Sequence, residues 1–460
     1  MINSFLKFCL TAVAILWTTG VCGQHVLTPA PEHFEKFNEV ENGWCASDAT
    51  ISLLLPDGNT LWLWGDCIVG TKISTYDVDN STATMINNAA IIEEEGVLKA
   101  YFEGTWQEPN SLIPSIDGDI FWPEHATIEN DTIKIFAIRI IFEDTGIPGF
   151  NFRVGTTHMA YIKYPEMEHI RTEEIKYITD STMRFGTHVF EDEGYTYIFG
   201  KKDTVNNGFK YPVPMLARVE KSVDEPWQFY AGDNQWSYNC SDAMPVGDRP
   251  MSESFFVYKK NEKYYLIMHE IWLIGELYIL EADQLTGPWN RASTGGIENN
   301  FAVIKPHGKN FTYNLFAHPH FKQGEDILIS YNVNNSDFWP IFDDTRNYRA
   351  RFHWMNVENA VSTTIPDTLD YFDSTVGTDK TFSNQEDHHS SFRVAGGNLY
   401  VEGAVTPSLL EIYGLDGRKF MSRRIIHDEV IPLFDIPSSM LLIRLTGRSD
   451  SQVQKIVNLH

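Results

Sequence analysis

Short apolar runs separated by turn residues dominate the chain from about residue 45 to residue 358. The runs are rich in Ile, Val, Tyr, Phe and Trp, and Gly, Asp and Asn lie between them. Helical periodicity is scarce. Runs of this length and composition, bounded by turn residues, are typical of β-strands. The pattern therefore predicts an all-β fold.

The predicted strands form hairpins that recur at a nearly constant interval. The five hairpin turns contain Gly58, Asn130, Gly194, Asn261 and Gly324, and the steps between them are 72, 64, 67 and 63 residues. Such a period suits a four-stranded propeller blade with long loops. The sequence therefore predicts a five-bladed β-propeller over residues 34–358. A stack of β-sandwich modules is the alternative, but sandwiches lack this spacing.

The remainder of the chain divides by composition. Residues 359–384 are rich in Ser, Thr and Asp and are predicted to be a linker, and residues 385–460 are predicted to form a small C-terminal β-sandwich. The runs Leu409–Arg418 and Ile436–Arg444, with Lys455–Val457, resemble the C-terminal sorting domain of the Bacteroidetes type IX secretion system. The resemblance implies that the type IX secretion machinery is a partner. A carbohydrate-binding sandwich is the alternative.

The N-terminal segment has the pattern of an export signal. Lys7 precedes an apolar run from Phe8 to Trp17, and small residues follow. We therefore expect residues 1–23 to be a signal peptide and the protein to be secreted or held at the cell surface. A lipoprotein signal with Cys22 as the acylated residue is the alternative. No later stretch predicts a membrane span.

The charge balance limits the class of partner. Lysine and arginine number 36 and aspartate and glutamate 62, which gives a formal net charge of −26. A nucleic acid or an anionic membrane surface requires a basic footprint, so neither is expected as a partner. Neutral or cationic substrates remain open, and the 13% of aromatic residues is sufficient for a globular core.

Three cysteines would remain in the predicted mature chain, namely Cys45, Cys67 and Cys240. They are too few for a disulfide framework and lack the spacing of a zinc site. Cys45 and Cys67 flank a predicted hairpin. The sequence leaves open whether these two form a disulfide.

Each predicted innermost strand begins with polar or charged residues, although the rest of the strand is apolar. The innermost strands of a propeller converge on one mouth of the central channel, which is a concave site. Buried charges are costly unless they are paired or used. The alternative is a polar lining around water or an ion. The polar residues at these strand starts include Asp48, Glu124, His125, Arg184, His188, Arg249, Glu253 and His318.

Asp48 and Glu253 are predicted to be a catalytic pair of carboxyl groups. Glycoside hydrolysis requires one protonated carboxyl group that donates to the leaving oxygen and one carboxylate that activates water or attacks. Asp66 ends the second strand of the first blade, and Glu124 lies on the second blade. Both are predicted to support the pair. For Asp66, a strand-end cap is an equal alternative.

Aromatic, cationic and amide side chains close to these positions are predicted to bind substrate. Aromatic faces stack on sugar rings, while the polar groups hydrogen-bond to hydroxyls. For any one of these residues, packing or a structural ion pair is the alternative. The predicted set is Trp44, Trp122, His125, Arg184, His188, Arg249, His318, Tyr331, Asn332 and Arg351.

The segments Gly43–Asp48 and Leu55–Asp66 resemble the opening of an uncharacterised secreted propeller family. That family is grouped with five-bladed glycoside hydrolases of the family-43 and endo-arabinanase type. Four further segments extend the resemblance, namely Met85–Asn88, Thr286–Trp289, Ala317–Pro319 and Leu328–Asn334. It implies a propeller fold and hydrolysis of a polysaccharide or oligosaccharide.

The resemblance also implies roles for particular carboxyl groups. Asp48 would be the base and Glu253 the acid, with Glu124 or Asp66 as a third carboxylate that tunes the acid. No cofactor is expected to be required, since no nucleotide-binding motif is present. A central calcium or sodium ion is allowed by the resemblance. A non-catalytic glycan-binding propeller and a polysaccharide lyase are the alternative functions.

Overall fold

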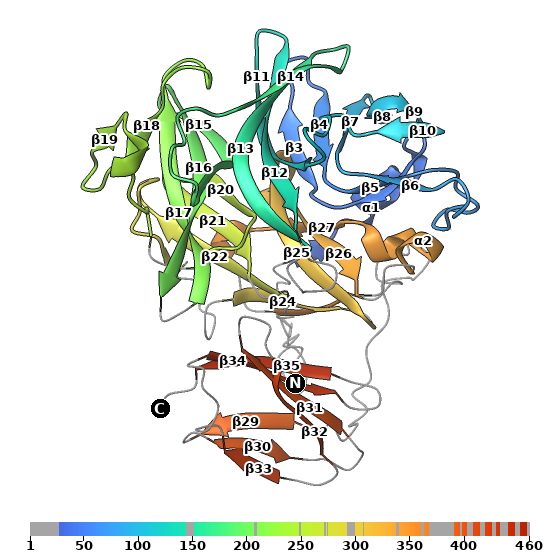
Figure 1. Ribbon diagram of the computed structural model, residues 1–460, viewed down its shortest axis with the longest axis vertical. Coiled ribbons are helices and arrows are strands. Elements are labelled where there is room, and N and C mark those ends of the chain that lie inside the picture. Colours follow the sequence, from blue (N-terminus) through green and yellow to red (C-terminus); the bar gives the residue numbers. More distant parts are fainter. Residues whose placement is uncertain are drawn as a thin grey trace, which may run out of the picture.

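The computed structural model describes most of the chain, and the described residues consist mainly of strands and turns (Figure 1). None of the helices in this part of the chain is long and apolar enough to cross a bilayer. The predicted all-β class is confirmed. The predicted signal peptide, residues 1–23, lies outside the described residues. These are 27–143, 151–206, 209–247, 250–270, 273, 275–291, 300–306, 308–336, 340–359, 363–367, 391–395, 398–402, 408–414, 419–425, 429–432, 440–446 and 451–457.

Between residues 27 and 367, five large sheets of four or more strands follow one another along the described chain (Figure 1). The first contains β3 (Ile51–Leu54), β4 (Thr60–Trp64), β7 (Ala89–Glu94) and β8 (Val97–Tyr101). The second contains β11 (Ile120–Glu129), β12 (Thr132–Phe142), β13 (Phe152–Lys163) and β14 (Glu168–Glu174). The third contains β15 (Met183–Asp192), β16 (Tyr195–Asn206), β17 (Phe209–Val219), β18 (Gln228–Tyr230) and β19 (Trp236–Ser237).

The fourth and fifth sheets each include a strand from a distant part of the sequence. The fourth contains β20 (Phe255–Lys260), β21 (Lys263–His269), β22 (Glu276–Ala282), β24 (Asn300–Pro306) and β28 (Thr363–Asp367), with β23 (Asn290–Arg291) beside β22. The fifth contains β25 (Asn310–Gln323), β26 (Asp326–Asn335), β27 (Arg351–Met355) and β1 (Leu27–Pro29). Strand β1 pairs antiparallel with β27, so the fifth sheet joins the start of the described chain to the end of the hairpin series.

Each sheet packs on its neighbours through alternate side chains of its strands. Consecutive residues of a strand point to opposite faces of a sheet, so each sheet contributes to two apolar clusters. The first strands of the sheets, β3, β11, β15, β20 and β25, contact one another in that order, and β25 contacts β3. Five clusters likewise connect the sheets in a cycle. Representative pairs are Leu63 with Ile135, Phe136 with Ile198, Phe199 with Leu266, Ile267 with Ile329, and Leu328 with Trp62.

Short elements lie beside the first and fifth sheets, except the helical turn Cys240–Asp242, which contacts β18 of the third sheet. The short strands are β2 (Trp44–Ser47), β5 (Cys67–Val69) and β6 (Thr84–Ile86), which form one sheet, and β9 (Glu103–Thr105) and β10 (Glu108–Asn110), which form another. The helical turns are α1 (Pro31–Glu35), η1 (Lys36–Glu39), η2 (Cys240–Asp242), α2 (Pro340–Asp343), η4 (Thr345–Tyr348) and η5 (Val357–Asn359). Although Cys45 and Cys67 lie on paired strands, they are free thiols, as is Cys240.

The C-terminal residues form two further sheets. One contains β29 (Ser391–Ala395), β30 (Asn398–Glu402) and β33 (Glu429–Pro432). The other contains β31 (Ser408–Gly414), β32 (Lys419–Ile425), β34 (Met440–Thr446) and β35 (Ser451–Val457). The predicted linker, 359–384, is not irregular throughout, because β28 within it pairs parallel with β24.

Candidate active site

Asp48 and Asp66 are brought together by the backbone around the first sheet. Asp48 follows β2 and Asp66 follows β4. The amide N–H of Gly65 donates to the carbonyl oxygen of Asp48 at 2.9 Å, and the amide of Asp48 donates to the carbonyl of Asp66 at 3.3 Å. A Cβ atom on Gly65 would lie 2.5 Å from Oδ1 of Asp48. A side chain at position 65 would therefore displace the carboxylate of Asp48.

No cation contacts the Asp48–Asp66 pair among the described residues; neutral donors do. The hydroxyl of Tyr313 donates to Oδ2 of Asp48 at 2.7 Å. Asn87 Nδ2 and Trp122 Nε1 each donate to Oδ1 of Asp66 at 3.1 Å. Burial, and then the charge of Asp66, raise the pKa of Asp48 to about 7, and burial also raises the pKa of Asp66. The pair therefore retains a proton near neutral pH.

A second group of charges is centred on Lys201 of β16. Its Nζ lies 3.2 Å from Oε1 of Glu124 and 3.0 Å from Oε2 of Glu253, and it also donates to the backbone carbonyl of Glu253. Arg184 Nη2 lies 3.7 Å from Oε1 of Glu253 and 2.8 Å from Oδ1 of Asp203. The side chain of Lys201 is 1% exposed, so this cation is almost fully desolvated.

The pKa values of the two glutamates in this group shift in opposite directions. Burial raises the pKa of Glu124 and outweighs the attraction of Lys201. Burial also opposes ionisation of Glu253, but the charges of Lys201 and Arg184 together lower its pKa. The side chain of Glu253 is nevertheless 59% exposed. An ionised carboxylate at Glu253 is therefore accessible to a ligand.

Two short connections link the aspartate pair to the Lys201 group. Trp122, which donates to Asp66, lies two residues before Glu124 on β11. Ser254, next to Glu253, donates to Oδ1 of Asn314 at 2.8 Å. Asn314 in turn follows Tyr313, the donor to Asp48. The structure thus gathers six predicted residues around these two groups: Asp48, Asp66, Glu124, Glu253, Arg184 and Trp122.

The other predicted substrate-binding residues that the structure describes all lie in the protein interior. Trp44 is 1% exposed and packs against Phe37 and Trp64, so it offers no free face to a sugar. Trp44 therefore has the packing role that was the alternative for these residues. Arg249 lies outside the described residues. The remaining side chains are at most 7% exposed: His125, His188, His318, Tyr331, Asn332 and Arg351.

Hydrogen bonds and ring contacts account for several of these buried polar groups. His318 bonds to Ser52 Oγ at 2.6 Å and to Ser330 Oγ at 2.9 Å. Asn332 donates to Thr50 at 2.9 Å, and the Arg351 guanidinium donates to backbone carbonyls. The ring centroids of His125 and His188 lie 4.7 Å apart in an edge-to-face arrangement. Burial lowers the pKa of both histidines, to about 4 for His125.

Sequence reasoning missed the residues that determine the charge state of the carboxyl groups. Lys201 lies just beyond the predicted strand Tyr195–Phe199, and a lysine continuing an apolar strand was an available signal. Tyr313 and Asn87 carried no comparable signal, although Asn87 lies within a segment that supported the resemblance. Tyr348, which also hydrogen-bonds to Asp48, lies at the end of η4.

The central calcium or sodium ion that the resemblance allowed stays a prediction. Within the described ranges, no group of three or more His, Cys, Asp or Glu side chains is arranged to hold a metal ion.

Comparison with solved structures shows what the fold is similar to. A Bacteroides ovatus structure provisionally described as a hydrolase matches with a TM-score of 0.54 and 17% identity, covering 71% of this chain and 89% of that chain. At this identity the similarity shows a shared fold alone. A GH43_1 enzyme from Xanthomonas citri gives a TM-score of 0.40, 11% identity and coverages of 74% and 94%. An α-L-arabinofuranosidase from Podospora anserina gives a TM-score of 0.38 and 11% identity, covering 72% of this chain and 94% of that chain.

Sequence comparison gives a family but no characterised relative. No curated protein matches the chain. A family model matches residues 31–359, which is more than half of the chain. The match includes every strand of the five large sheets except β1 and β28. The chain therefore belongs to the family described as "Domain of unknown function (DUF5005)".

Proposed function

We propose that this protein is an exported glycoside hydrolase that cleaves a neutral polysaccharide or oligosaccharide. We infer that the five large sheets are the blades of a five-bladed propeller, since their first strands contact one another in a cycle. One observation carries the proposed activity. The pKa values of two carboxyl groups are shifted in opposite directions: that of Asp48 is raised to about 7, whereas that of the exposed Glu253 is lowered.

Glycoside hydrolysis uses this kind of difference between two carboxyl groups. A protonated carboxyl group donates to the leaving oxygen while a carboxylate activates water or attacks the sugar. Groups whose surroundings separate their pKa values are suited to the two roles. Trp122 donates to Asp66, lies two residues before Glu124 and is partly exposed, so its ring offers an aromatic surface to a sugar.

The charge surroundings favour a different division of roles from the one that the resemblance implies. The resemblance makes Asp48 the base and Glu253 the acid. In the unliganded protein, Asp48 retains the proton and Glu253 is held ionised by Lys201 and Arg184. We therefore assign proton donation to Asp48, with Asp66 maintaining its raised pKa. A carboxylate with a lowered pKa is a weak base, so attack or electrostatic stabilisation suits Glu253 as well as activation of water.

A panel of neutral polysaccharides tests the proposed activity. We expect the wild type to release reducing ends from at least one of them, and Asp48→Asn and Glu253→Gln to lose most of that release. Equal turnover by all three proteins would rule out the assigned residues. Sugar binding without turnover by the wild type would instead favour the glycan-binding alternative.

The lyase alternative receives little support from the same contacts. A lyase needs a base beside a cation that neutralises a uronate carboxylate. Arg184 is paired with Asp203 and Glu253, and His188 and His318 are buried. Products that absorb in the ultraviolet would nevertheless identify a lyase in the same assay.

We further propose that a signal peptide and a C-terminal sorting domain direct the protein out of the cell. The proposal rests on the sequence of residues 1–23 and 385–460. Mass spectrometry of the protein from a type IX-secreting host is expected to find both segments removed or modified. Retention of the intact chain inside that host would contradict the proposal.

A further inference from the structure

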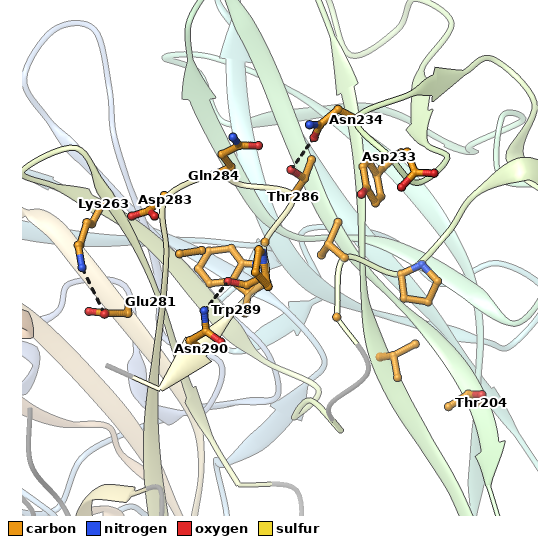
Figure 2. Close-up of a pocket in the computed structure, with 18 of the residues that line it drawn as sticks. Thr204, Asp233, Asn234, Lys263, Glu281, Asp283, Gln284, Thr286, Trp289 and Asn290 are labelled. Atoms are coloured by element: carbon orange, nitrogen blue, oxygen red, sulfur yellow. Dashed lines mark hydrogen bonds and ion pairs between the residues drawn. The ribbon is translucent and has the colours of Figure 1, made fainter. Parts of the chain in front are cut away.

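A cavity of about 1010 Å³ lies between the third and fourth sheets, and none of its lining residues belongs to the candidate active site (Figure 2). One wall comes from β16, β17 and the turn between β18 and β19. The other comes from the end of β22 and the loop that leads to β23. Its volume is at the upper end of the range for small-ligand sites and would hold several sugar rings.

The two walls of this cavity are held together by contacts between loops. Thr286 Oγ1 donates to Oδ1 of Asn234 at 3.2 Å, which joins the β22–β23 loop to the β18–β19 turn (Figure 2). A Cβ atom on Gly287 would lie 2.9 Å from the carbonyl oxygen of Val246, and the φ angle of Gly287 is +82°. The loop therefore packs directly on the 245–247 segment, and the cavity is formed before any ligand arrives.

The side chains that line the cavity combine hydrogen-bonding groups with aromatic rings. Asp233, Asp283 and Gln284 are exposed, so their oxygen and amide groups are available to a ligand. Tyr230 is partly exposed and supplies ring surface. Trp289 is 8% exposed, and its indole N–H has no hydrogen-bond acceptor among the described residues. Polar edges beside aromatic faces match the alternating hydroxyl and C–H surfaces of sugars.

The charge of the cavity selects against anionic ligands. Lys263 is paired with Glu281 at 3.3 Å. Asp233 and Asp283 form no ion pair with any described residue. The lining carries three carboxylates, Asp233, Glu281 and Asp283, against the single ammonium of Lys263. This excess of negative charge repels an anionic sugar or a phosphate, whereas neutral hydroxyls can donate to the carboxylates.

We propose that this cavity is a second, non-catalytic binding site for a neutral oligosaccharide. The choice of ligand class rests on the proposed function. Thr204 at the cavity lies three residues after Lys201 on β16, a separation of about 10 Å along a strand. The cavity and the Lys201 group thus share strand β16, on which the side chains of Lys201 and Thr204 point to opposite faces of the sheet.

Isothermal titration calorimetry of the full chain tests the second site. The titrants are xylohexaose, cellohexaose and arabinohexaose, and the starting protein is Asp48→Asn, which prevents turnover. We expect two binding sites for at least one titrant. Adding Asp283→Ala and Gln284→Ala is expected to remove one site or weaken it at least ten-fold. Adding Glu225→Ala, an exposed acidic residue outside the cavity, is expected to leave both.

The outcomes separate this inference from the proposed function. An unchanged number of sites and unchanged affinities in the Asp283→Ala/Gln284→Ala protein would overturn the inference, whatever the turnover of the wild type. Binding of oligolysine, but of no sugar, that is lost in the same protein would also overturn it. If the wild type has no turnover but a single site disappears with these two substitutions, the inference holds and the proposed function fails.

Discussion

The two groups of carboxyl side chains differ in what compensates their charge. The Asp48–Asp66 pair receives hydrogen bonds from neutral donors alone, among the described residues. Glu124 and Glu253 share the ammonium of Lys201. The pKa values follow this difference, since that of Asp48 rises to about 7 whereas that of Glu253 falls.

Burial alone does not determine the charge of a carboxyl group in this protein. Neutral donors stabilise a carboxylate, but at Asp48 they do not offset desolvation and a second carboxylate. Two cations do offset desolvation at Glu253, yet the single contact with Lys201 does not do so at Glu124. At Glu124, the charge of Glu253 adds to the effect of burial, whereas Glu253 lies close to both Lys201 and Arg184.

The largest effect is expected from Asp48→Asn on catalysis. Loss of a general acid or base costs about 10²–10⁴-fold in rate, so kcat/KM should fall by that amount. If Asp48 donates the proton, the wild-type kcat/KM declines as pH rises through about 7, and the variant lacks this decline. A rise through the same pH would reverse the roles of Asp48 and Glu253. Asp131→Asn, in an exposed turn, is the matched control.

Removal of the shared cation should cause the next largest effect. Lys201→Met leaves Glu124 and Glu253 without their common partner, and breaking a buried ion pair costs about 3–5 kcal/mol. The free energy of unfolding, measured with urea, should fall by that amount at pH 7. Lys202→Met removes a neighbouring lysine that is 33% exposed and should cost less than about 1 kcal/mol. Equal losses would show that Lys201 does not stabilise the pair.

The pH dependence of stability should differ in sign between the two groups. The folded-state pKa of Asp48 is raised to about 7, so its favourable contribution is complete at low pH and is lost as pH rises to about 7. The stability of Asp48→Asn relative to the wild type should therefore increase between about pH 4 and 7. Glu253 has a lowered pKa, so its contribution is lost as pH falls. Urea unfolding of each variant across pH 3–8 measures both trends, and parallel trends would contradict the comparison.

A smaller effect is expected from Tyr313→Phe. The hydroxyl of Tyr313 lowers the pKa of Asp48 through its hydrogen bond, so removing it should raise that pKa further. Loss of one hydrogen bond to a charged group is worth about 1.5–3 kcal/mol, and part of this disappears when Asp48 is protonated. The pH of the kcat/KM transition should move upward with a modest change in its maximum. Tyr177→Phe, which removes a hydrogen bond to Asp224 elsewhere, should not move it.

Much of the strand pattern could be predicted from the sequence because local chemistry determines it. Each predicted hairpin is present, since turn residues and β-branched or aromatic runs act over a few residues. The pairing of β1 with β27 and of β24 with β28 was not predicted. These contacts join distant segments, and no local pattern encodes them.

The candidate site was predictable in its acidic residues but not in their surroundings. Asp48, Asp66, Glu124 and Glu253 were identified from their places in the blade pattern. Their charge states depend on Lys201, which lies on the third sheet, and on Tyr313, which lies on the fifth. Trp44 was assigned to substrate because tryptophan suits both stacking and packing, and only the surrounding aromatic side chains distinguish the two.

The pairing of Leu27 with Met355 has a consequence for how the molecule is completed. Strand β1 pairs with residues that are synthesised more than 300 positions later. The fifth sheet is therefore complete only when nearly the whole series of sheets has been synthesised. Contacts of such long sequence separation form slowly, because loop closure must precede them. A chain that leaves the cell unfolded would thus acquire its final strand only after both ends of the series have crossed, and trimming a few residues before Ala30 would leave β27 as an open sheet edge.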